Sequence, residues 1–206
     1  MIIETLEDVH THALGLAAIE PRFAAAYEAT GPLPLRRRKD GFAALFDAIV
    51  SQQVSVASAD AIWKRLKDAK LTGPRKIMWA TDEELRACGL SRQKMRYARA
   101  LAEARIDYRA LRSAPSEEVV EILTEVSGIG PWTAEIYAMF SLGHADVFAP
   151  GDLALQESAR ILFELDERPK EREFREMAQA WSPHRAVAAR LLWAYYHIAK
   201  QREGIR

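Results

Sequence analysis

The stretch LTEVSGIGPWTA, residues 123–134, decides the fold expected of this 206-residue chain. Gly128 and Gly130 flank a single apolar residue, and Pro131 follows them. Glycine permits a positive φ and a close approach of the backbone to a ligand, and proline is well tolerated at the first position of a helix. The stretch therefore predicts a tight hairpin between two helices, within a helix-hairpin-helix that covers about residues 116–142.

The remainder of the chain predicts helices and almost no strands. Ala, Leu, Glu and Arg are abundant, apolar residues recur at helical spacing, and strand-like alternation is scarce. Ser91 and Ser116 are expected to cap two of the helices. The fold class expected is all-α, with about ten helices near residues 23–27, 42–50, 56–70, 82–87, 91–104, 116–124, 131–142, 152–165, 171–181 and 183–200.

Two long connections divide this pattern, at Gly31–Lys39 and Gly143–Pro150. They predict a two-lobed helical bundle with a cleft between the lobes. A terminal lobe would combine residues 1–39 with residues 144–206, and a central lobe of residues 40–143 would carry the helix-hairpin-helix.

The bulk composition excludes several classes of protein. The chain is 49% hydrophobic and 28% charged, which is normal for a globular protein. The single cysteine, Cys88, excludes a disulfide framework and a cysteine-rich zinc or iron–sulfur site within one chain. The N-terminus lacks the basic residues of a signal peptide, and no apolar run reaches membrane-spanning length. A cytoplasmic protein without a membrane partner is expected.

The net charge is zero, but the charges are unevenly distributed. Residues 61–112 have a balance of +8, and residues 113–180 have a balance of −9. The basic segment could face phosphates, although solvated helix faces explain the same pattern, and charge alone favours that simpler explanation.

The predicted hairpin has a chemistry of its own. The helix that follows it presents unpaired N–H groups and the positive end of its dipole, so a phosphate can bind there without a basic side chain. Gly128, Gly130 and Thr133 are the expected contacts. A common alternative is an ordinary helical corner with a glycine C-cap.

A single carboxylate, Asp152, stands in Pro150-Gly151-Asp152 at the start of the next predicted helix. The simplest interpretation is an N-cap. The same placement also stabilises an ionised carboxylate that can face a developing cation, as in the cleavage of a glycosidic bond. Asp146 is the nearest rival, and hydrogen bonding within its loop is the role expected of it.

Five ordered blocks resemble a known family. With the hairpin, the chain matches the helix-hairpin-helix (HhH-GPD) DNA glycosylases over about residues 40–200, and within them it is most similar to the 3-methyladenine DNA glycosylase II branch. The other four blocks are IVSQQVS (49–55), GLSRQK (89–94), DVFAPGDLAL (146–155) and WSPHRAVAARLLW (181–193).

The resemblance implies a base-excision repair enzyme that flips a damaged nucleotide out of double-stranded DNA. Asp152 would be the catalytic aspartate, Trp132 would hold the base in its pocket, and Gln53 would be the wedge that fills the vacated space. Some members carry an apolar wedge, so Gln53 departs from them. Without the resemblance, core packing would be the first interpretation of Trp132, and an exposed turn that of Gln53. The remaining tryptophans are interpreted as packing residues: Trp63, Trp79, Trp181 and Trp193.

The resemblance also implies which reaction is catalysed. Members that cleave the DNA strand have a lysine where this chain has Trp132, which implies a monofunctional enzyme. A single catalytic carboxylate fits alkylated purines, whose positive charge lets the base leave without protonation. The substrates would be 3-methyladenine and, as a second candidate, 7-methylguanine. Two alternatives stay open: a glycosylase for another damaged base, such as hypoxanthine, ethenoadenine or uracil, and a catalytically inactive DNA-binding module.

No cofactor is required by this scheme, and no iron–sulfur cluster is expected. The family's hairpin often holds a monovalent cation, Na⁺ or K⁺, through main-chain carbonyls, which correspond here to Thr124, Val126 and Ile129. The expected partner is double-stranded DNA that contains damaged bases, and the expected oligomeric state is a monomer. In a bacterium the protein would be associated with the nucleoid.

Overall fold

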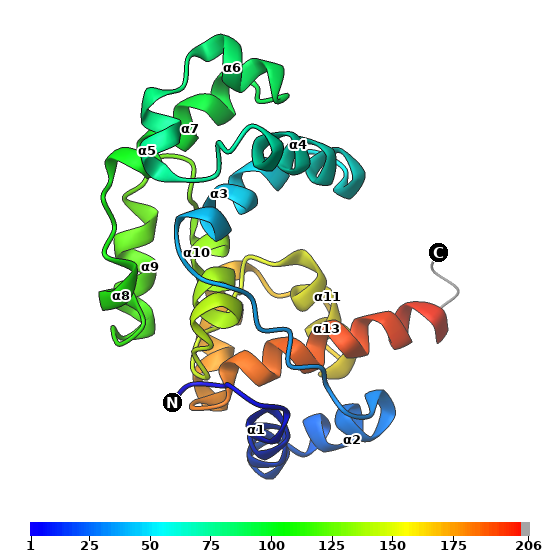
Figure 1. Ribbon diagram of the computed structural model, residues 1–206. Coiled ribbons are helices and arrows are strands. Elements are labelled where there is room, and N and C mark those ends of the chain that lie inside the picture. The colour runs from blue at the N-terminus through cyan, green and yellow to red at the C-terminus, as the bar shows by residue number, and fades with distance from the viewer. Residues whose placement is uncertain (203–206) are drawn as a thin grey trace. The chain divides into compact units, whose positions relative to one another are not determined.

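The computed structural model describes residues 1–202, and helices dominate this part of the chain (Figure 1). The all-α prediction is confirmed, since these residues form 13 α-helices, one π-helical turn and one 3₁₀ turn. The only extended pairing among them is an isolated bridge between Ile2 and His144. No helix in this part of the chain has both the length and the apolar character needed to cross a membrane.

The chain forms two compact units, one of which is residues 38–137. Its helices are α3 (Phe42–Ser51), α4 (Val56–Asp68), α5 (Pro74–Trp79), α6 (Asp82–Ala87), α7 (Arg92–Glu103), α8 (Tyr108–Leu111), α9 (Ser116–Thr124) and α10 (Pro131–Tyr137).

The other unit combines residues 1–37 with the chain from Ala138 onward. Its α-helices are α1 (Leu6–Ile19), α2 (Pro21–Thr30), α11 (Leu153–Leu162), α12 (Glu171–Met177) and α13 (Arg185–Arg202), with a π-helical turn at Ala138–Leu142 and a 3₁₀ turn at Ala178–Trp181. The boundaries between the units therefore fall after residues 37 and 137, whereas the sequence placed them after residues 39 and 143.

Three helices escaped the sequence-based prediction: α1, α5 and α8. At the start of α1, Thr5 accepts a hydrogen bond from the N–H of Asp8 while the Asp8 carboxylate accepts one from the N–H of Thr5. Aspartate at this position is a weaker signal than the usual Glu or Gln of a capping box. Helix α5 begins at Pro74, which reads as a break in the sequence but is tolerated as a first helical residue.

Most predicted boundaries lie close to those observed, with informative exceptions. Ser91 caps α7 as expected, since its hydroxyl accepts a hydrogen bond from the N–H of Lys94 at 3.3 Å. The expected Ser116 cap is wrong, because Ser116 is already the first residue of α9 and Pro115 occupies the capping position. The helix expected over 131–142 changes to π-helical geometry at Ala138.

An aromatic cluster forms the core of the unit that contains both ends of the chain. Trp181 is stacked against Phe163, with ring centroids 5.6 Å apart, and meets Phe23, Phe148 and Phe174 edge-on. Stacked and edge-on contacts of this kind stabilise aromatic pairs beyond their buried area. The packing role predicted for Trp181 is confirmed.

The core of residues 38–137 is built around α3, which packs against α4 and α7. Phe42, Leu45, Phe46, Ile49 and Val50 are its buried residues, and they recur at the predicted helical spacing. The ring of Trp63 meets that of Phe46 edge-on at 5.5 Å, as a packing residue should. The same interpretation is wrong for Trp79, which is 86% exposed.

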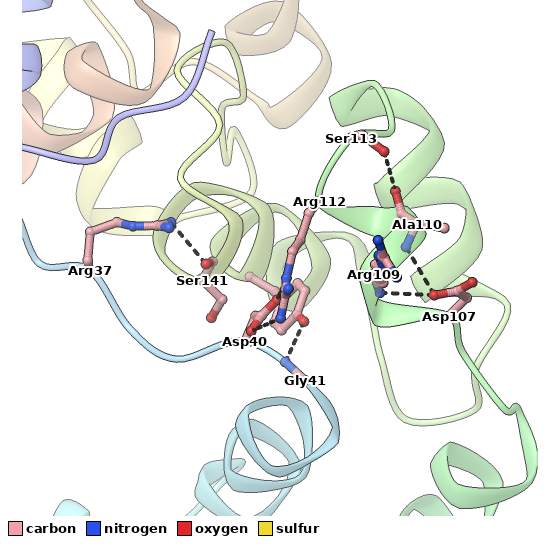
Figure 2. A network of polar contacts seen from close by, with 10 residues as sticks. Arg37, Asp40, Gly41, Asp107, Arg109, Ala110, Arg112, Ser113 and Ser141 are labelled. Carbon is pink, nitrogen blue, oxygen red and sulfur yellow. Dashed lines mark hydrogen bonds and ion pairs between the residues drawn. The ribbon is translucent and has the colours of Figure 1, made fainter.

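Polar contacts anchor the segment that leads into α3 (Figure 2). Arg112 donates to both carboxylate oxygens of Asp40, and the N–H of Gly41 donates to the Tyr137 hydroxyl at 2.8 Å. Burial raises the pKa of Tyr137 to about 12, so its hydroxyl keeps its proton at neutral pH. Within the other unit, Arg37 donates to the carbonyl of Ser141 at 2.9 Å, which gives one residue of the basic run 36–39 a structural role.

Candidate functional site

The hairpin, residues 125–130, joins α9 to α10, as the sequence predicted. Gly128 has a φ of +98°, and a Cβ built on it would lie 2.3 Å from Cγ of Tyr97. Only glycine fits there, since a positive φ and a lack of space both exclude a side chain. A Cβ built on Gly130, in contrast, would meet nothing within 4 Å. The backbone at Gly130 therefore faces open space in which a ligand can approach.

The hydrogen-bond ladder of α10 begins at the far end of the hairpin. The N–H of Ile129 donates to the carbonyl of Val126 at 3.0 Å, and the helical ladder begins with the N–H of Ala134 donating to Gly130 at 3.1 Å. Thr133 lies one residue before that first donor, where backbone N–H groups have no partner within the helix. Its side chain is buried, so a phosphate contact from Thr133 would come from the backbone. The phosphate contacts stay a prediction.

The hairpin also contains the main-chain carbonyls that were predicted to hold a monovalent cation. Val126 already accepts one hydrogen bond, but a carbonyl oxygen has two lone pairs and retains one for a cation. The hydroxyl of Thr124 is directed back to its own helix, where it contacts the carbonyls of Val120 and Glu121. Residues 1–202 contain no cluster of three or more His, Cys, Asp or Glu side chains suited to a metal ion.

Gln53 lies in the turn that ends α3, residues 51–54, called here the wedge turn. Its side chain is exposed and its φ is +56°, a left-handed conformation that costs a residue with a Cβ about 1–2 kcal/mol. The neighbouring Gln52 is half-buried and donates its side-chain amide to the carbonyl of Gly128 at 2.9 Å. The two adjacent glutamines thus differ, because the side chain of Gln53 is exposed and that of Gln52 is hydrogen-bonded to the hairpin.

One pocket joins the wedge turn to the hairpin. It has a volume of about 580 Å³, and Gln53, Gly128 and Gly130 all line it, together with Lys94 and Tyr97 from α7. Two sets of residues that the sequence singled out separately, and that lie about 75 positions apart, therefore share one surface.

Trp132 is the second residue of α10 and lies in its first turn, directly after the hairpin. Its side chain is 47% exposed, so the alternative interpretation as a core residue is wrong. An indole with this exposure can offer its electron-rich face to a cationic ring. Its role as the wall of a base pocket stays a prediction.

Asp152 is fixed at the N-cap of α11, in the unit that contains both ends of the chain. Its Oδ1 accepts hydrogen bonds from the N–H groups of Ala154 at 2.9 Å and Leu155 at 3.1 Å. The indole Nε1 of Trp193 donates to the same oxygen at 3.3 Å. Three donors at the N-terminus of the helix therefore hold the carboxylate in one orientation.

A hydrogen bond from Gln156 holds the turn before Asp152. The buried side-chain amide of Gln156 donates to the carbonyl of Pro150 at 2.7 Å. Since Gln156 lies one helical turn beyond Asp152, it ties the first turn of α11 back to the Pro150-Gly151-Asp152 turn. The position of the carboxylate thus depends on contacts from both sides.

Asp146, the rival carboxylate, is engaged in holding its loop. It accepts hydrogen bonds from the hydroxyl of Ser182 at 2.8 Å and from the guanidinium of Arg185. Burial acts to raise the pKa of Asp146, but the bonds from Arg185 and Ser182 outweigh it and the net pKa lies below its ordinary value. The expected role in loop hydrogen bonding is confirmed.

Several residues that support the predicted side chains could not be recognised from the sequence. Trp193 was interpreted as packing alone; its ring does lie 5.9 Å from that of Phe140, but its N–H contacts Asp152. Gln52 and Lys94 belong to two of the matching blocks, 49–55 and 89–94, but nothing in the sequence assigns them a role. Their partners lie 41 to 76 positions away in the chain, so no local spacing could reveal these contacts.

Comparison with known proteins places the chain among DNA repair enzymes. The model of the "HhH-GPD superfamily base excision DNA repair protein" family matches residues 46–184. A DNA-3-methyladenine glycosylase 1 of Schizosaccharomyces pombe is 29% identical over the whole chain and 94% of its own length. The crystal structure of a DNA-3-methyladenine glycosidase from Bacillus halodurans is 33% identical, with a TM-score of 0.83 over 90% of this chain and 89% of its own. An S. pombe 3-methyladenine DNA glycosylase in complex with abasic DNA is 28% identical, with a TM-score of 0.75 over 89% and 95%.

Proposed function

Because the chain belongs to the HhH-GPD superfamily of base excision DNA repair proteins, we propose that it is a monofunctional DNA glycosylase. Its reaction is the hydrolysis of the N-glycosidic bond of alkylated purines, with 3-methyladenine as the main substrate and 7-methylguanine as a second one. The observation that carries this proposal is Asp152, a carboxylate held by three donors at the start of α11. The names of the relatives support the choice of substrate.

The chemistry needs one carboxylate rather than two. Alkylation at N3 or N7 gives the purine a positive charge, so the base leaves without being protonated by a general acid. Positive charge then develops on the sugar, as in glycoside hydrolysis. A carboxylate with a fixed orientation stabilises this charge, and it can also orient the attacking water. Asp152 has these properties.

The damaged nucleotide must leave the duplex before this step. Backbone N–H groups at Gly128, Gly130 and Thr133 bind a phosphate, and Gln53 fills the space that the nucleotide vacates. Trp132 then attracts the cationic base, at about 0.5–2 kcal/mol per contact. Because Trp132 stands where strand-cleaving members have a lysine, no Schiff base forms there and the product is an abasic site.

Further parts of the proposal concern the surroundings of the reaction. The partner is double-stranded DNA that contains a damaged base, the protein acts as a monomer, and Na⁺ or K⁺ binds to the carbonyls of Thr124, Val126 and Ile129. Light scattering after gel filtration tests the monomer. A second experiment tests the cation by measuring the affinity of the protein for lesion-containing duplex as K⁺ replaces tetramethylammonium at constant ionic strength. Only a site of defined size distinguishes K⁺ from tetramethylammonium.

The decisive experiment measures free bases released from methylated duplex DNA by the wild type and by Asp152→Asn. Asparagine caps a helix about as well as aspartate, so the fold should be retained while the charge is lost. Release of 3-methyladenine and 7-methylguanine by the wild type, with a loss of at least about 100-fold in the variant, is expected. Asp60→Asn, on the exposed side of α4, is the matched control and should keep full activity. A wild type that binds DNA but releases neither base would point to a glycosylase for another damaged base or to an inactive DNA-binding module.

A further inference from the structure

We propose that Gln52, Lys94 and Tyr97 form a brace that fixes the wedge turn to the hairpin, so that phosphate binding and wedge insertion occur as the movement of one rigid piece. These three are positioning residues, since they act through Gln53 and Gly128. The inference rests on the proposed function and adds to it the device that couples two of its steps. All the contacts lie within the unit of residues 38–137.

Gln52 makes the direct link. Its Nε2 lies 2.9 Å from the carbonyl oxygen of Gly128, and only the amide nitrogen of a glutamine can donate to a carbonyl. The backbone N–H of Gln52 also donates to the carbonyl of Ile49 at 3.3 Å, which makes Gln52 the C-cap of α3. One residue therefore terminates the helix before the wedge and contacts the glycine at which the hairpin turns.

Lys94 holds the same end of α3 from a second direction. Its Nζ donates to the carbonyl of Val50 at 2.6 Å, and its side chain is buried. Burial of an ammonium group is costly, and it lowers the pKa of Lys94. The carbonyls in the last turn of a helix offset this cost, since they lack partners within the helix and form the negative end of its dipole.

Tyr97 completes the brace on the hairpin side. It lies one helical turn after Lys94 on α7, so the two side chains leave the same face of that helix. The ring of Tyr97 occupies the space where a side chain at position 128 would stand, with Cγ 2.3 Å from the position of the absent Cβ. Helix α7 therefore contacts the end of α3 through Lys94 and the hairpin through Tyr97, the next residue on the same face.

This arrangement has a consequence for base flipping. Gln53 is exposed and holds a left-handed backbone conformation, so its flanking residues must prevent it from relaxing. If the wedge turn were flexible, it would have to become ordered when Gln53 enters the DNA, and the chain would lose conformational entropy at that step. A wedge turn already tied to the hairpin is placed by the same contact that binds the phosphate. The brace should therefore matter where a base pair must be opened, and little where the base is already unpaired.

The test compares Gln52→Glu, Gln52→Ala and Lys94→Met with the wild type on two oligonucleotide duplexes. Each duplex contains one 7-methylguanine, paired with cytosine in the first and placed in a one-nucleotide bulge without a partner in the second. Single-turnover rates of base release are measured on both. The expected result is a loss of about tenfold or more on the paired substrate, the size expected when one buried hydrogen bond is removed, and a much smaller loss on the bulge.

The two substitutions at position 52 separate a hydrogen bond from simple packing. Glutamate keeps the shape of glutamine but directs oxygens at the Gly128 carbonyl, so it should lose more activity on the paired substrate than alanine does. If packing alone mattered, glutamate would be the milder change. Lys76→Met, an exposed lysine of the same basic segment, controls for the loss of one positive charge and should behave as the wild type does.

Two results would overturn the proposal: equal losses on the paired and bulged substrates, or no loss on either. Lys94 is buried, and a Lys94→Met protein that failed to fold would leave the Gln52 variants to decide the question. The proposed function fails in a different way, since a wild type that released base from neither duplex and no 3-methyladenine from methylated DNA would refute it whatever the variants did.

Discussion

The two hairpin glycines should respond in opposite ways to the same substitution. Gly128→Ala adds a methyl group at a φ of +98° and 2.3 Å from Cγ of Tyr97. Gly130→Ala adds the same group where nothing lies within 4 Å, and the φ of Gly130 is not left-handed. We expect the first change to reduce stability and the second to reduce DNA binding without loss of stability.

The magnitude at position 128 follows from two contributions. A left-handed φ costs a residue with a Cβ about 1–2 kcal/mol. The ring of Tyr97 must also move by more than about 1 Å to reach an ordinary carbon–carbon distance, and overpacking of this kind costs about 1–3 kcal/mol. The free energy of unfolding should therefore fall by about 2–5 kcal/mol, a large part of the 5–15 kcal/mol typical of a folded protein.

At position 130 the unfolding free energy should stay the same or rise by up to about 1 kcal/mol, because alanine restricts the unfolded chain. The added methyl group would occupy the space through which a phosphate approaches the backbone. Affinity for undamaged duplex DNA, measured by fluorescence anisotropy at fixed salt, should fall by about tenfold.

Urea denaturation followed by circular dichroism measures the stability of both variants. The reasoning is refuted if Gly128→Ala is as stable as the wild type, since the clash would then relax at no cost. It is equally refuted if Gly130→Ala binds DNA as tightly as the wild type, because the open backbone at Gly130 would then not be a phosphate site.

Two further predictions concern the unit that combines residues 1–37 with the chain from Ala138 onward. Trp193→Phe keeps the ring beside Phe140 but removes the N–H that contacts Asp152. The rate of base release should therefore fall by about five- to tenfold, far less than in Asp152→Asn. A rate equal to that of the wild type would show that this bond does not orient the carboxylate. His12 and His184 contact each other through their Nδ1 atoms at 2.8 Å, and burial lowers the pKa of each below its ordinary 6.5, so the unfolded state binds protons more readily. Stability should therefore be complete above about pH 6.5 and decline as the pH falls below it, and urea midpoints at pH 7.5 and 5.5 that do not differ in this direction would contradict the assignment.

Local features of the sequence determined the hairpin and most of the helices. The pattern around Gly128 and Gly130 predicted a turn because glycine alone accepts the backbone conformation found at Gly128. Asp152 was recognised as a helix cap because a cap depends on N–H groups two and three residues away. These properties depend on neighbours in the chain, and the sequence contains them directly. Where local signals conflicted, the prediction failed: Ser116, which follows Pro115, is not the cap of its helix, and the helix that begins at Pro74 was missed.

The tertiary structure alone decided which side chains support the predicted ones. Trp193 contacts Asp152 from 41 positions away, and Gln52 contacts Gly128 from 76 positions away. The sequence could not distinguish Gln52, which is held, from Gln53, which protrudes, since the two are identical neighbours. Such contacts form because packing of the helices brings distant segments together, and the geometry of that packing depends on the whole core rather than on the spacing of any motif.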